Sequence, residues 1–241
     1  MSIIRTSHIL ISINYNGKEK TCISHKGGVT VSIIQLSKMC KMYGKKTIFN
    51  DFSLDICEGD FVAFMGPSGC GKSTLLNIIG LIEDFDEGEL TIVGQVNVKP
   101  NSLKANKILR NNISYLFQNF ALVEEETVEY NLKMALKYVK ATRKQKNLKI
   151  VEVLNTVGLE NFQRRPIYEL SGGEQQRVAI ARIMLKPCNI VLADEPTGSL
   201  DEHNRDLILN LIKKLNTEGK TVILVTHDKY VAEQCHKIIH L

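Results

Sequence analysis

A glycine-rich segment between two apolar runs constrains this chain more than any other feature of its sequence. It reads Gly-Pro-Ser-Gly-Cys-Gly-Lys-Ser-Thr and follows the apolar run Phe61–Met65. A second apolar run, Leu75–Ile82, comes directly after it. Strand, glycine loop and helix in this order are typical of a loop whose main-chain N–H groups surround a polyphosphate. The sequence therefore predicts a strand that ends in an anion-binding loop and continues into a helix.

The backbone and the side chains of this loop are expected to contact a nucleotide in different ways. The loop glycines have no Cβ, so the backbone can wrap closely around an anion. Lys72 is expected to reach the β- and γ-phosphates, and the Ser73 hydroxyl to bind Mg²⁺. A glycine-rich turn that caps an ordinary helix is the alternative. The candidate nucleotide-binding residues of the loop are Gly66, Pro67, Ser68, Gly69, Cys70, Gly71, Lys72, Ser73 and Thr74.

Composition limits the class of protein. The 241 residues are 44% hydrophobic and 24% charged, enough for one core and one nucleotide-binding domain. No apolar run approaches the roughly 20 residues of a membrane helix, so a partner would have to span the membrane. A net charge of +5 is too small to indicate nucleic-acid binding. The 6 cysteines lack Cys-x-x-Cys or metal-ligand spacing, which predicts reduced thiols and a cytoplasmic location.

The N-terminal stretch differs from the rest of the chain. Residues 1–30 are polar and show no sustained period, so we expect an extension that is either a disordered tail or not translated, with translation starting at Val31. From residue 31 to 241 strand and helix signals alternate, which predicts an α/β domain. The block from about 123 to 169 has no strand signal and predicts an inserted helical subdomain. Between Tyr130 and Lys149 its charged residues are all basic, which favours a solvated face over a docking surface.

Periodicity and apolar runs place the individual elements. The expected strands are Ser32–Leu36, Phe52–Ile56, Phe61–Met65, Leu90–Val93, Ile113–Phe117, Ile190–Ala193, Val222–Val225 and Lys237–Leu241. The expected helices are Lys72–Ile82, Val128–Lys140, Gln145–Val157, Gly172–Leu185 and Glu202–Leu215.

Two carboxylates follow a strand that is apolar without alternation, as in a strand covered on both faces. Asp194 stands at the end of Ile190–Ala193 and is placed to hold Mg²⁺ opposite Ser73. Glu195 is one residue further on and could polarise a water for attack on the γ-phosphate.

A second helix start carries an unusual pair of glycines. Ser171 and Glu174 form a Ser-x-x-Glu capping box, which is the local structural interpretation. A capping box does not require Gly172 and Gly173, which are poor helix formers in the first turn. The pair indicates a second anion site at a helix terminus. One nucleotide cannot easily use both sites of one subunit, so the second site is expected to serve a partner subunit's nucleotide.

These motifs resemble those of the ATP-binding cassette (ABC) family in content and in order. Residues 66–74 resemble its Walker A motif, residues 190–195 its Walker B motif, and residues 170–176 its signature motif. The resemblance implies an α/β fold with a P-loop NTPase core, an antiparallel β subdomain and an inserted α-helical subdomain.

The resemblance also implies roles for residues outside those three motifs. Gln118 resembles the Q-loop glutamine that contacts Mg²⁺ and senses the membrane partner, and His227 the switch histidine that holds the γ-phosphate. Tyr43 resembles the aromatic residue that stacks on adenine, and Asp201 belongs to a D-loop-like Ser-Leu-Asp. Taken singly, Tyr43 could be a core aromatic, Gln118 a loop amide and His227 a satisfied polar residue at a strand end.

The implied activity is ATP hydrolysis. In this interpretation two copies close head to tail around two Mg-ATP and drive a separately encoded membrane permease from the cytoplasmic face, without nucleic acid. The expected catalytic residues are Glu195, His227, Gln118 and Lys72, and the expected Mg²⁺ ligands are Ser73, Gln118 and Asp194. Ser171, Gly172, Gly173 and Asp201 complete the predicted nucleotide site.

The finer resemblance is to macrolide-export, lipoprotein-release and cell-division ATPases, with features of bacteriocin-export ATPases around Gln118. Export of a peptide or antimicrobial is the main interpretation. A regulatory ATPase of the cell-division type, or a soluble cassette ATPase, is the alternative. The chain departs from these ATPases at two places. Glu174 stands where many of them have Gln, and residues 123–126 replace a common proline-containing stretch where the permease would dock.

Overall fold

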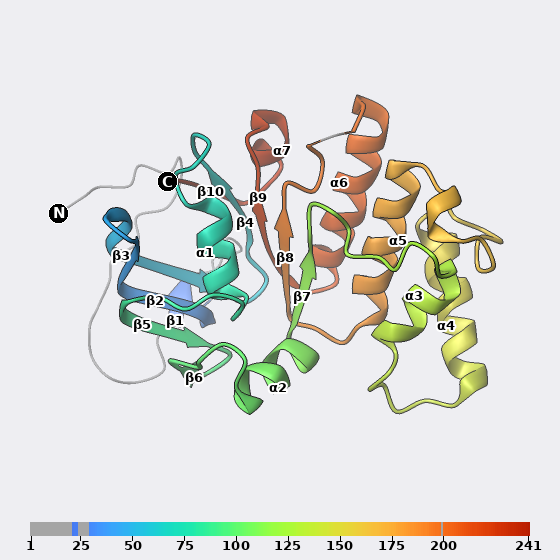
Figure 1. The fold of residues 1–241 in the computed structure, drawn as a ribbon, viewed down its shortest axis with the longest axis horizontal. Helices are drawn as coiled ribbons and strands as arrows, with labels where there is room; N and C mark the ends of the chain where they lie inside the picture. Colours follow the sequence, from blue (N-terminus) through green and yellow to red (C-terminus); the bar gives the residue numbers. More distant parts are fainter. Residues whose placement is uncertain (1–20, 24–28, 199) are drawn as a thin grey trace.

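The computed structural model describes residues 21–23, 29–198 and 200–241, and these form two sheets and the helices around them (Figure 1). The predictions for the extension 1–30 fall almost wholly outside the described residues. One sheet is antiparallel, with β2 central and paired to β1, β3 and β5, and with β6 beyond β5. Its strands are β1 (Thr21–Ile23), β2 (Val29–Tyr43), β3 (Lys46–Cys57), β5 (Glu87–Ile92) and β6 (Gln95–Val96).

The second sheet is parallel throughout and has the order β10-β4-β9-β8-β7. Because all its strands run the same way, their carboxyl ends meet at one edge. Its strands are β4 (Phe61–Met65), β7 (Ile113–Leu116), β8 (Ile190–Asp194), β9 (Thr221–Val225) and β10 (Lys237–His240).

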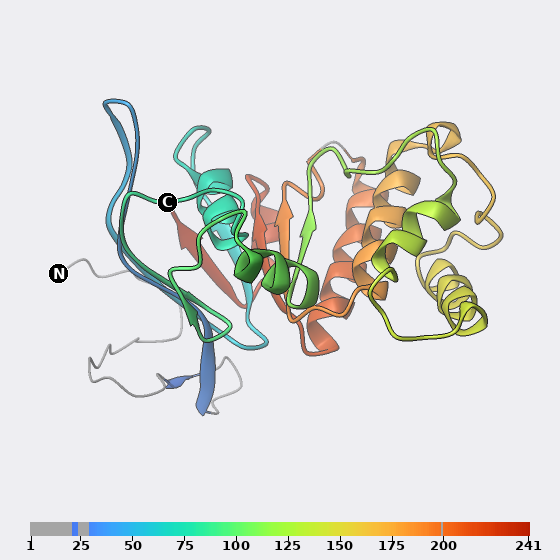
Figure 2. The same ribbon diagram turned by 60° about the horizontal axis from the view of Figure 1, so that its bottom comes forward.

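Helices connect these strands, and some of them cover the parallel sheet. They are α1 (Lys72–Ile79), α2 (Leu103–Asn111), α3 (Val128–Ala135), α4 (Arg143–Thr156), the 3₁₀ turn η1 (Ile167–Glu169), α5 (Gly172–Leu185), α6 (Glu202–Thr217) and α7 (Lys229–Glu233). Figure 2 shows the antiparallel sheet at one end of the molecule and α3 and α4 at the other. Along the described helices no stretch is long and apolar enough to cross a membrane.

The two faces of the parallel sheet belong to different apolar cores. On β4, Phe64 faces a core that also contains Leu76 of α1 and Leu36 of the antiparallel sheet. Phe61 of the same strand faces the other core, which contains Ile180 of α5. The alternation explains why this strand is apolar at every position, since both of its faces are buried.

A third core joins the inserted helices α3 and α4 to α5, the helix that begins at the signature motif. Leu132 of α3 and Leu154 of α4 pack with Val178 and Ala181 of α5. Because α5 contributes to two cores, it mechanically connects the inserted helices to the parallel sheet. The predicted fold class, with its antiparallel sheet and helical insertion, is confirmed, while the subdomain limits at about 123 and 169 stay predictions.

Local assignments differ from the sequence predictions at several places. α2, α7 and β6 were not predicted, and α3 ends at Ala135, whereas the prediction extended it to Lys140. α2 buries only Ala105 and Ile108, and the Ser102 side chain at its start accepts a hydrogen bond from the Ala105 N–H. The prediction of reduced thiols is wrong at Cys57, which is disulfide-bonded. Cys40, Cys70, Cys188 and Cys235 are free.

A buried ion pair fixes the edge strand β10 to the loop before β4. Asp60 is fully buried, and its Oδ2 accepts from Lys237 Nζ at 2.6 Å and from the Cys57 N–H at 2.9 Å. Removing one member of such a pair leaves the other charge buried without its counter-ion.

We therefore expect Lys237→Met to lower the free energy of unfolding by about 3 kcal/mol. Urea denaturation followed by circular dichroism would measure it. Lys229→Met, at an exposed lysine of α7, is the matched control and should stay within about 0.5 kcal/mol of the parent. Equal stability of the two variants would show that the buried pair of Asp60 and Lys237 does not stabilise the fold.

Candidate functional site

The glycine-rich loop connects β4 to α1 at the carboxyl edge of the parallel sheet. Gly69 and Gly71 have φ values of 79° and 101°, in the region that favours glycine. A Cβ on Gly71 would lie 2.4 Å from Ile48 Cγ2, and one on Gly66 would lie 2.7 Å from Cys70 Sγ. Lys72 Nζ lies inside the loop and donates to the carbonyl oxygens of Gly66 at 2.8 Å and Pro67 at 2.9 Å. The main chain of the loop therefore fits closely around the Lys72 ammonium group and forms a cradle for it.

The start of α1 is the part of this cradle that suits an anion. Its N-cap is Gly71, and no side chain among the described residues caps the first-turn N–H groups. Every other α-helix of the described residues begins with a side-chain cap. The uncapped N–H groups and the positive end of the helix dipole therefore point into the loop. This arrangement fits a phosphate group.

Walker A and Walker B meet through one hydrogen bond. Ser73 Oγ donates to Asp194 Oδ1 at 3.2 Å. Burial raises the pKa of the Asp194 carboxyl and the neighbouring Glu195 charge adds to the rise, whereas the Ser73 hydrogen bond and the Lys72 charge lower it. A desolvated carboxylate beside a hydroxyl gains from a bound cation. The pair therefore fits Mg²⁺, which prefers oxygen ligands and keeps other positions for water and phosphate oxygens.

Glu195 occupies a strained and partly buried position. Its φ is 45°, and the Val225 carbonyl accepts from its N–H at 3.1 Å. Oε1 lies 3.0 Å from His227 Nδ1, while the buried Oε2 accepts no hydrogen bond from any residue that the structure describes. The side chain of Glu195 is 18% exposed and that of His227 is 69% exposed. The free oxygen is thus available to a water or a hydroxyl group from outside the chain.

Gln118 lies in the loop after β7 and lines a small cavity of about 20 Å³ together with Glu195 and Gln176. The loop turns sharply, because Phe120 and Ala121 both have positive φ values of 60° and 47°. Arg182 of α5 holds this turn, donating to the Phe120 and Ala121 carbonyls at 2.7 and 2.5 Å. Sequence reasoning missed Arg182, since its carbonyl partners are distant in sequence.

Tyr43 stands at the end of β2 and is 48% exposed, which excludes the core-aromatic alternative. Its hydroxyl group hydrogen-bonds to Glu83, and Lys41 Nζ lies 4.8 Å from its ring centroid. Lys41 also pairs with Glu83 at 2.9 Å. This contact set holds the ring in one orientation, and the sequence gives no signal for Glu83 because it lies 40 residues away.

The signature segment is at the surface and carries the predicted capping box. Ser171 Oγ donates to Glu174 Oε2 at 2.8 Å and accepts from the Glu174 N–H at 3.4 Å. Ser171 and Gly172 are exposed, and a Cβ on Gly172 would contact none of the described residues within 4 Å. A residue on a second molecule can therefore reach this helix start.

The buried glycine of the signature contacts the helix that begins at Asp201. A Cβ on Gly173 would lie 3.0 Å from Asn204 Oδ1. Asn204 Nδ2 donates to Asp201 Oδ2 at 2.7 Å, and Asp201 caps α6. Arg177 donates to Asn204 Oδ1 at 3.3 Å. Asn204, another residue that sequence reasoning missed, thus links the signature helix to the D-loop-like segment.

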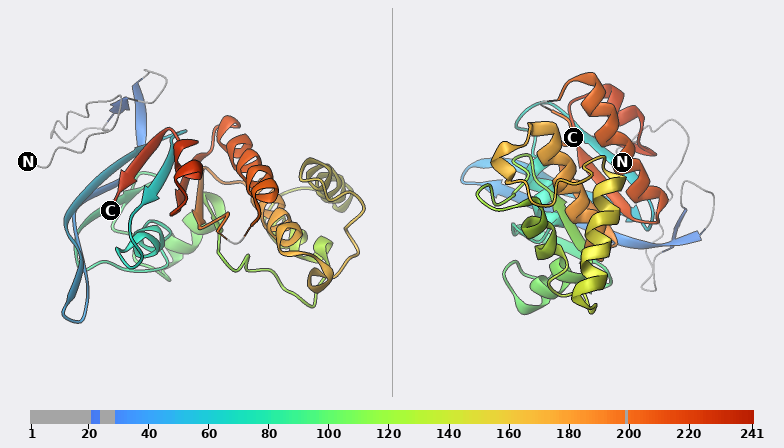
Figure 3. Two further views of the ribbon diagram at one scale, coloured as in Figure 1. Left: turned by 90° about the horizontal axis from the view of Figure 1, so that it is seen from above. Right: turned by 90° about the vertical axis from the view of Figure 1, so that its right-hand side faces the viewer.

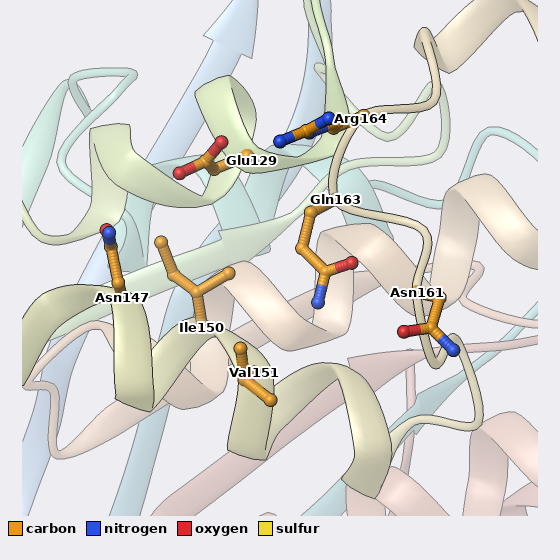
Figure 4. A pocket seen from close by; sticks show the side chains of 7 residues that line it. All are labelled: Glu129, Asn147, Ile150, Val151, Asn161, Gln163 and Arg164. Atoms are coloured by element: carbon orange, nitrogen blue, oxygen red, sulfur yellow. The ribbon is translucent and has the colours of Figure 1, made fainter.

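A larger pocket of about 410 Å³ lies apart from the motif residues, between α3, α4 and the chain after α4 (Figure 4). Its lining includes Ile150 and Val151 of α4, with Glu129, Gln163 and Arg164 across from them. None of the predicted nucleotide-site residues lines it.

Comparison with known families agrees with the geometry. Residues 49–198 match the family model described as "ABC transporter". The chain belongs to the ABC transporter family. The recognition from its motifs is thereby confirmed.

Several proteins of known name are similar to this ABC chain. The macrolide export ATP-binding/permease protein MacB of Mannheimia succiniciproducens is 34% identical over 215 residues, covering 88% of this chain and 33% of that protein. MacB of Escherichia coli K12 is 37% identical over 194 residues, covering 80% and 30%. The chain spans about a third of the length of the curated relatives it matches.

Solved structures of ABC cassettes share the fold. The dimeric structure of MJ0796, a bacterial ABC transporter cassette, has a TM-score of 0.78 and 40% identity, covering 86% of this chain and 94% of that one. A dimeric post-hydrolysis state of MJ0796 bound to ADP and Pi has a TM-score of 0.76 at the same identity and coverage.

Gly71→Ala is expected to weaken ATP binding at least about tenfold, because the added Cβ would enter the space of Ile48 and force the loop open. Titration with a fluorescent ATP analogue would measure the change. Gly94→Ala is the matched control, since its φ is 69° but a Cβ there meets nothing within 4 Å. The control should lose about 1 kcal/mol of stability and no affinity. Undiminished binding by the Gly71 variant would contradict the cradle.

Arg182→Met is expected to lower kcat of ATP hydrolysis about tenfold or more while leaving KM for ATP nearly unchanged, because Gln118 would lose its position. Arg182→Lys keeps one donor and should recover part of the rate. Steady-state kinetics would separate the two parameters, and circular dichroism would check folding. A raised KM with unchanged kcat would show that Arg182 does not position this loop.

Proposed function

We propose that this chain is the ATP-hydrolysing subunit of an export system and that it works as a head-to-tail dimer on a membrane permease. The family assignment makes the chain an ATPase that binds ATP and Mg²⁺. The main observation in support of this site is the 3.2 Å hydrogen bond between Ser73 and Asp194, which joins the uncapped start of α1 to the carboxyl end of β8. The similarity to MacB proteins supports export.

The phosphate loop would hold the triphosphate in the proposed site. Its main-chain N–H groups and Lys72 would face the β- and γ-phosphates. The Tyr43 ring has a cation over it, Lys41, and would stack on adenine through its other face. Ser73, Asp194 and Gln118 would hold Mg²⁺, which neutralises charge on the phosphate oxygens. Pro67, Ser68, Cys70 and Thr74 complete the loop around the nucleotide.

Glu195 is proposed to activate the attacking water. The water oxygen attacks the γ-phosphorus, the bond from that phosphorus to the β–γ bridging oxygen breaks, and the products are ADP and phosphate. The proton that the water loses passes to Glu195, whose unpartnered Oε2 suits this acceptor role. His227, 3.0 Å from Oε1, orients the carboxylate and lies exposed where it can contact the γ-phosphate.

The second copy is proposed to supply Ser171, Gly172 and Gly173 to this nucleotide. Ser171 and Gly172 are exposed at the start of α5, and Asp201 lies near them through Asn204. Without a nucleotide the positive ends of two helices would face each other, so the γ-phosphate is what makes closure favourable. The dimeric structures of MJ0796, one of them bound to ADP and Pi, support dimerisation.

The membrane partner is proposed to be a separately encoded permease contacted from the cytoplasmic face, and the cargo to be a peptide, bacteriocin or other antimicrobial. The relatives named ATP-binding/permease proteins support a permease partner. Co-purification of the chain from its native membrane, with mass spectrometry of the captured membrane protein, tests this part. Recovery without any membrane protein would count against it.

Glu195→Gln is expected to give a stable dimer in the presence of ATP and Mg²⁺, because the variant binds ATP but releases little phosphate. Gel filtration with light scattering would measure the mass. Glu202→Gln, on the exposed first turn of α6, is the control and should hydrolyse ATP like the parent. A Glu195 variant that remains monomeric under these conditions would overturn the head-to-tail scheme.

A further inference from the structure

Two stretches of the chain carry basic side chains and no acidic ones. Residues 90–123 contain Lys99, Lys104, Lys107 and Arg110 but neither Asp nor Glu. Residues 130–151 contain Lys133, Lys137, Lys140, Arg143, Lys144, Lys146 and Lys149, again without an acid. The whole chain has 31 basic and 26 acidic residues, so the remainder is net acidic. The modest net charge therefore conceals a strong segregation of charge.

The tertiary structure joins these two stretches at one edge of the molecule. α2 and the connection between α3 and α4 lie at the bottom of Figure 1 and again at the bottom of the right-hand view in Figure 3. Arg110 Cζ lies 4.7 Å from the ring centroid of Tyr138, which stands in that connection. We define the basic edge by its exposed cations Lys104, Lys107, Arg110, Lys137, Lys140 and Arg143.

The cations of the basic edge have no carboxylate partners. In the described part of the chain none of them forms an ion pair, whereas Lys99 and Lys133 beside them pair with Asp84 and Glu129. The three cations of α2 recur every third residue, so they follow one side of the helix while Ala105 and Ile108 are buried. Their charge is thus left for a partner outside the chain.

Exposed apolar side chains stand among these cations. Leu103, the first residue of α2, is 90% exposed, and Tyr138 is 63% exposed. Leu148 of α4 is 54% exposed. Basic residues interleaved with exposed leucine and tyrosine are typical of surfaces that lie on the interface of a lipid bilayer.

The basic edge is also remote from the nucleotide site. The carboxyl ends of the parallel strands and the start of α5 lie at the top of Figure 1, at the opposite edge. A partner at the basic edge would therefore leave the phosphate loop and the signature segment uncovered.

We propose that the basic edge docks on the anionic phospholipid headgroups of the membrane beside which this ATPase works. Lysine ammonium groups suit mobile headgroups because they are compact charges that require no fixed geometry. Single-stranded nucleic acid needs free aromatic faces for its bases. The Tyr138 ring instead has Arg110 and Lys137 within 4.7 and 5.7 Å of its centroid. The surface therefore favours a lipid partner.

The expected strength follows from the number of cations. Each basic residue close to an anionic bilayer strengthens binding by roughly fivefold, so even partial engagement of four lysines gives at least about a tenfold effect. The attraction is screened by salt, so binding should weaken as ionic strength rises.

The experiment is flotation of the purified full chain with vesicles of phosphatidylcholine alone or of equimolar phosphatidylcholine and phosphatidylglycerol. The parent should bind only the anionic vesicles. The fourfold variant K104Q/K107Q/K137Q/K140Q should bind at least about tenfold less, and the corresponding Lys-to-Arg variant should bind like the parent. The matched control K38Q/K45Q/K214Q/K229Q removes the same charge from exposed lysines elsewhere and should also bind like the parent.

A spectroscopic measurement keeps the proposal testable if the fourfold variant does not fold. The chain contains no Trp, so Y138W introduces a single reporter at the basic edge. Its emission should shift to the blue with anionic vesicles, while that of Y168W, an equally exposed site on η1, should not.

Three results would overturn the proposal. One is failure of the parent to bind anionic vesicles at low salt. A second is an equal loss of binding in the K104Q/K107Q/K137Q/K140Q variant and its control, or equal spectral shifts of the two tryptophan variants. The third is binding to a single-stranded RNA oligonucleotide that is tighter than binding to anionic vesicles and is lost in the same fourfold variant.

Discussion

The parallel register of the second sheet is the constraint on which the functional architecture depends. β4, β9 and β8 are hydrogen-bonded neighbours, so their carboxyl ends emerge at one edge. The phosphate loop leaves β4, Asp194 ends β8, and His227 follows β9. The hydrogen bond from Ser73 to Asp194 closes this edge across 121 residues of sequence. A slip of one strand by one residue would exchange the buried faces of both apolar cores as well as separating these groups.

α5 connects the candidate site to the rest of the molecule. Two cations one turn apart, Arg182 of α5 and Lys186 directly after it, contact the chain on both sides of β7. Arg182 donates to the Phe120 and Ala121 carbonyls, which follow β7. Lys186 donates to the Leu109 carbonyl, which precedes β7, at 2.7 Å and to the Ile113 carbonyl at the start of β7 at 2.6 Å. Burial lowers the pKa of both groups. In the described part of the chain main-chain carbonyls, and no carboxylate, accept their hydrogen bonds. The strand that leads to Gln118 is thereby tied to the helix that begins at Ser171.

Charge is divided between opposite edges of the molecule in a way that suits the proposed work. The edge that carries the proposed nucleotide site combines the uncapped start of α1, Lys72 and the two carboxylates of Asp194 and Glu195, and burial there raises the pKa of Asp194. The basic edge instead has exposed lysines and arginines that solvent surrounds. The proposed hydrolysis and the proposed membrane attachment therefore use different surfaces of the molecule.

The sequence by itself determined the elements whose information is local. The phosphate loop, the capping box at Ser171, the apolar strand before Asp194 and the fold class all follow from residues that are neighbours in the chain, and Gly172–Leu185 is a helix as predicted. The contacts of Arg182 with the Phe120 carbonyl, of Glu83 with Tyr43 and of Asn204 with Arg177, and the meeting of the two acid-free stretches at Arg110 and Tyr138, were decided only by the tertiary structure. Each joins groups separated by 27 or more residues, and no local period or motif encodes such a pairing, because it exists only after the sheets and helices have packed.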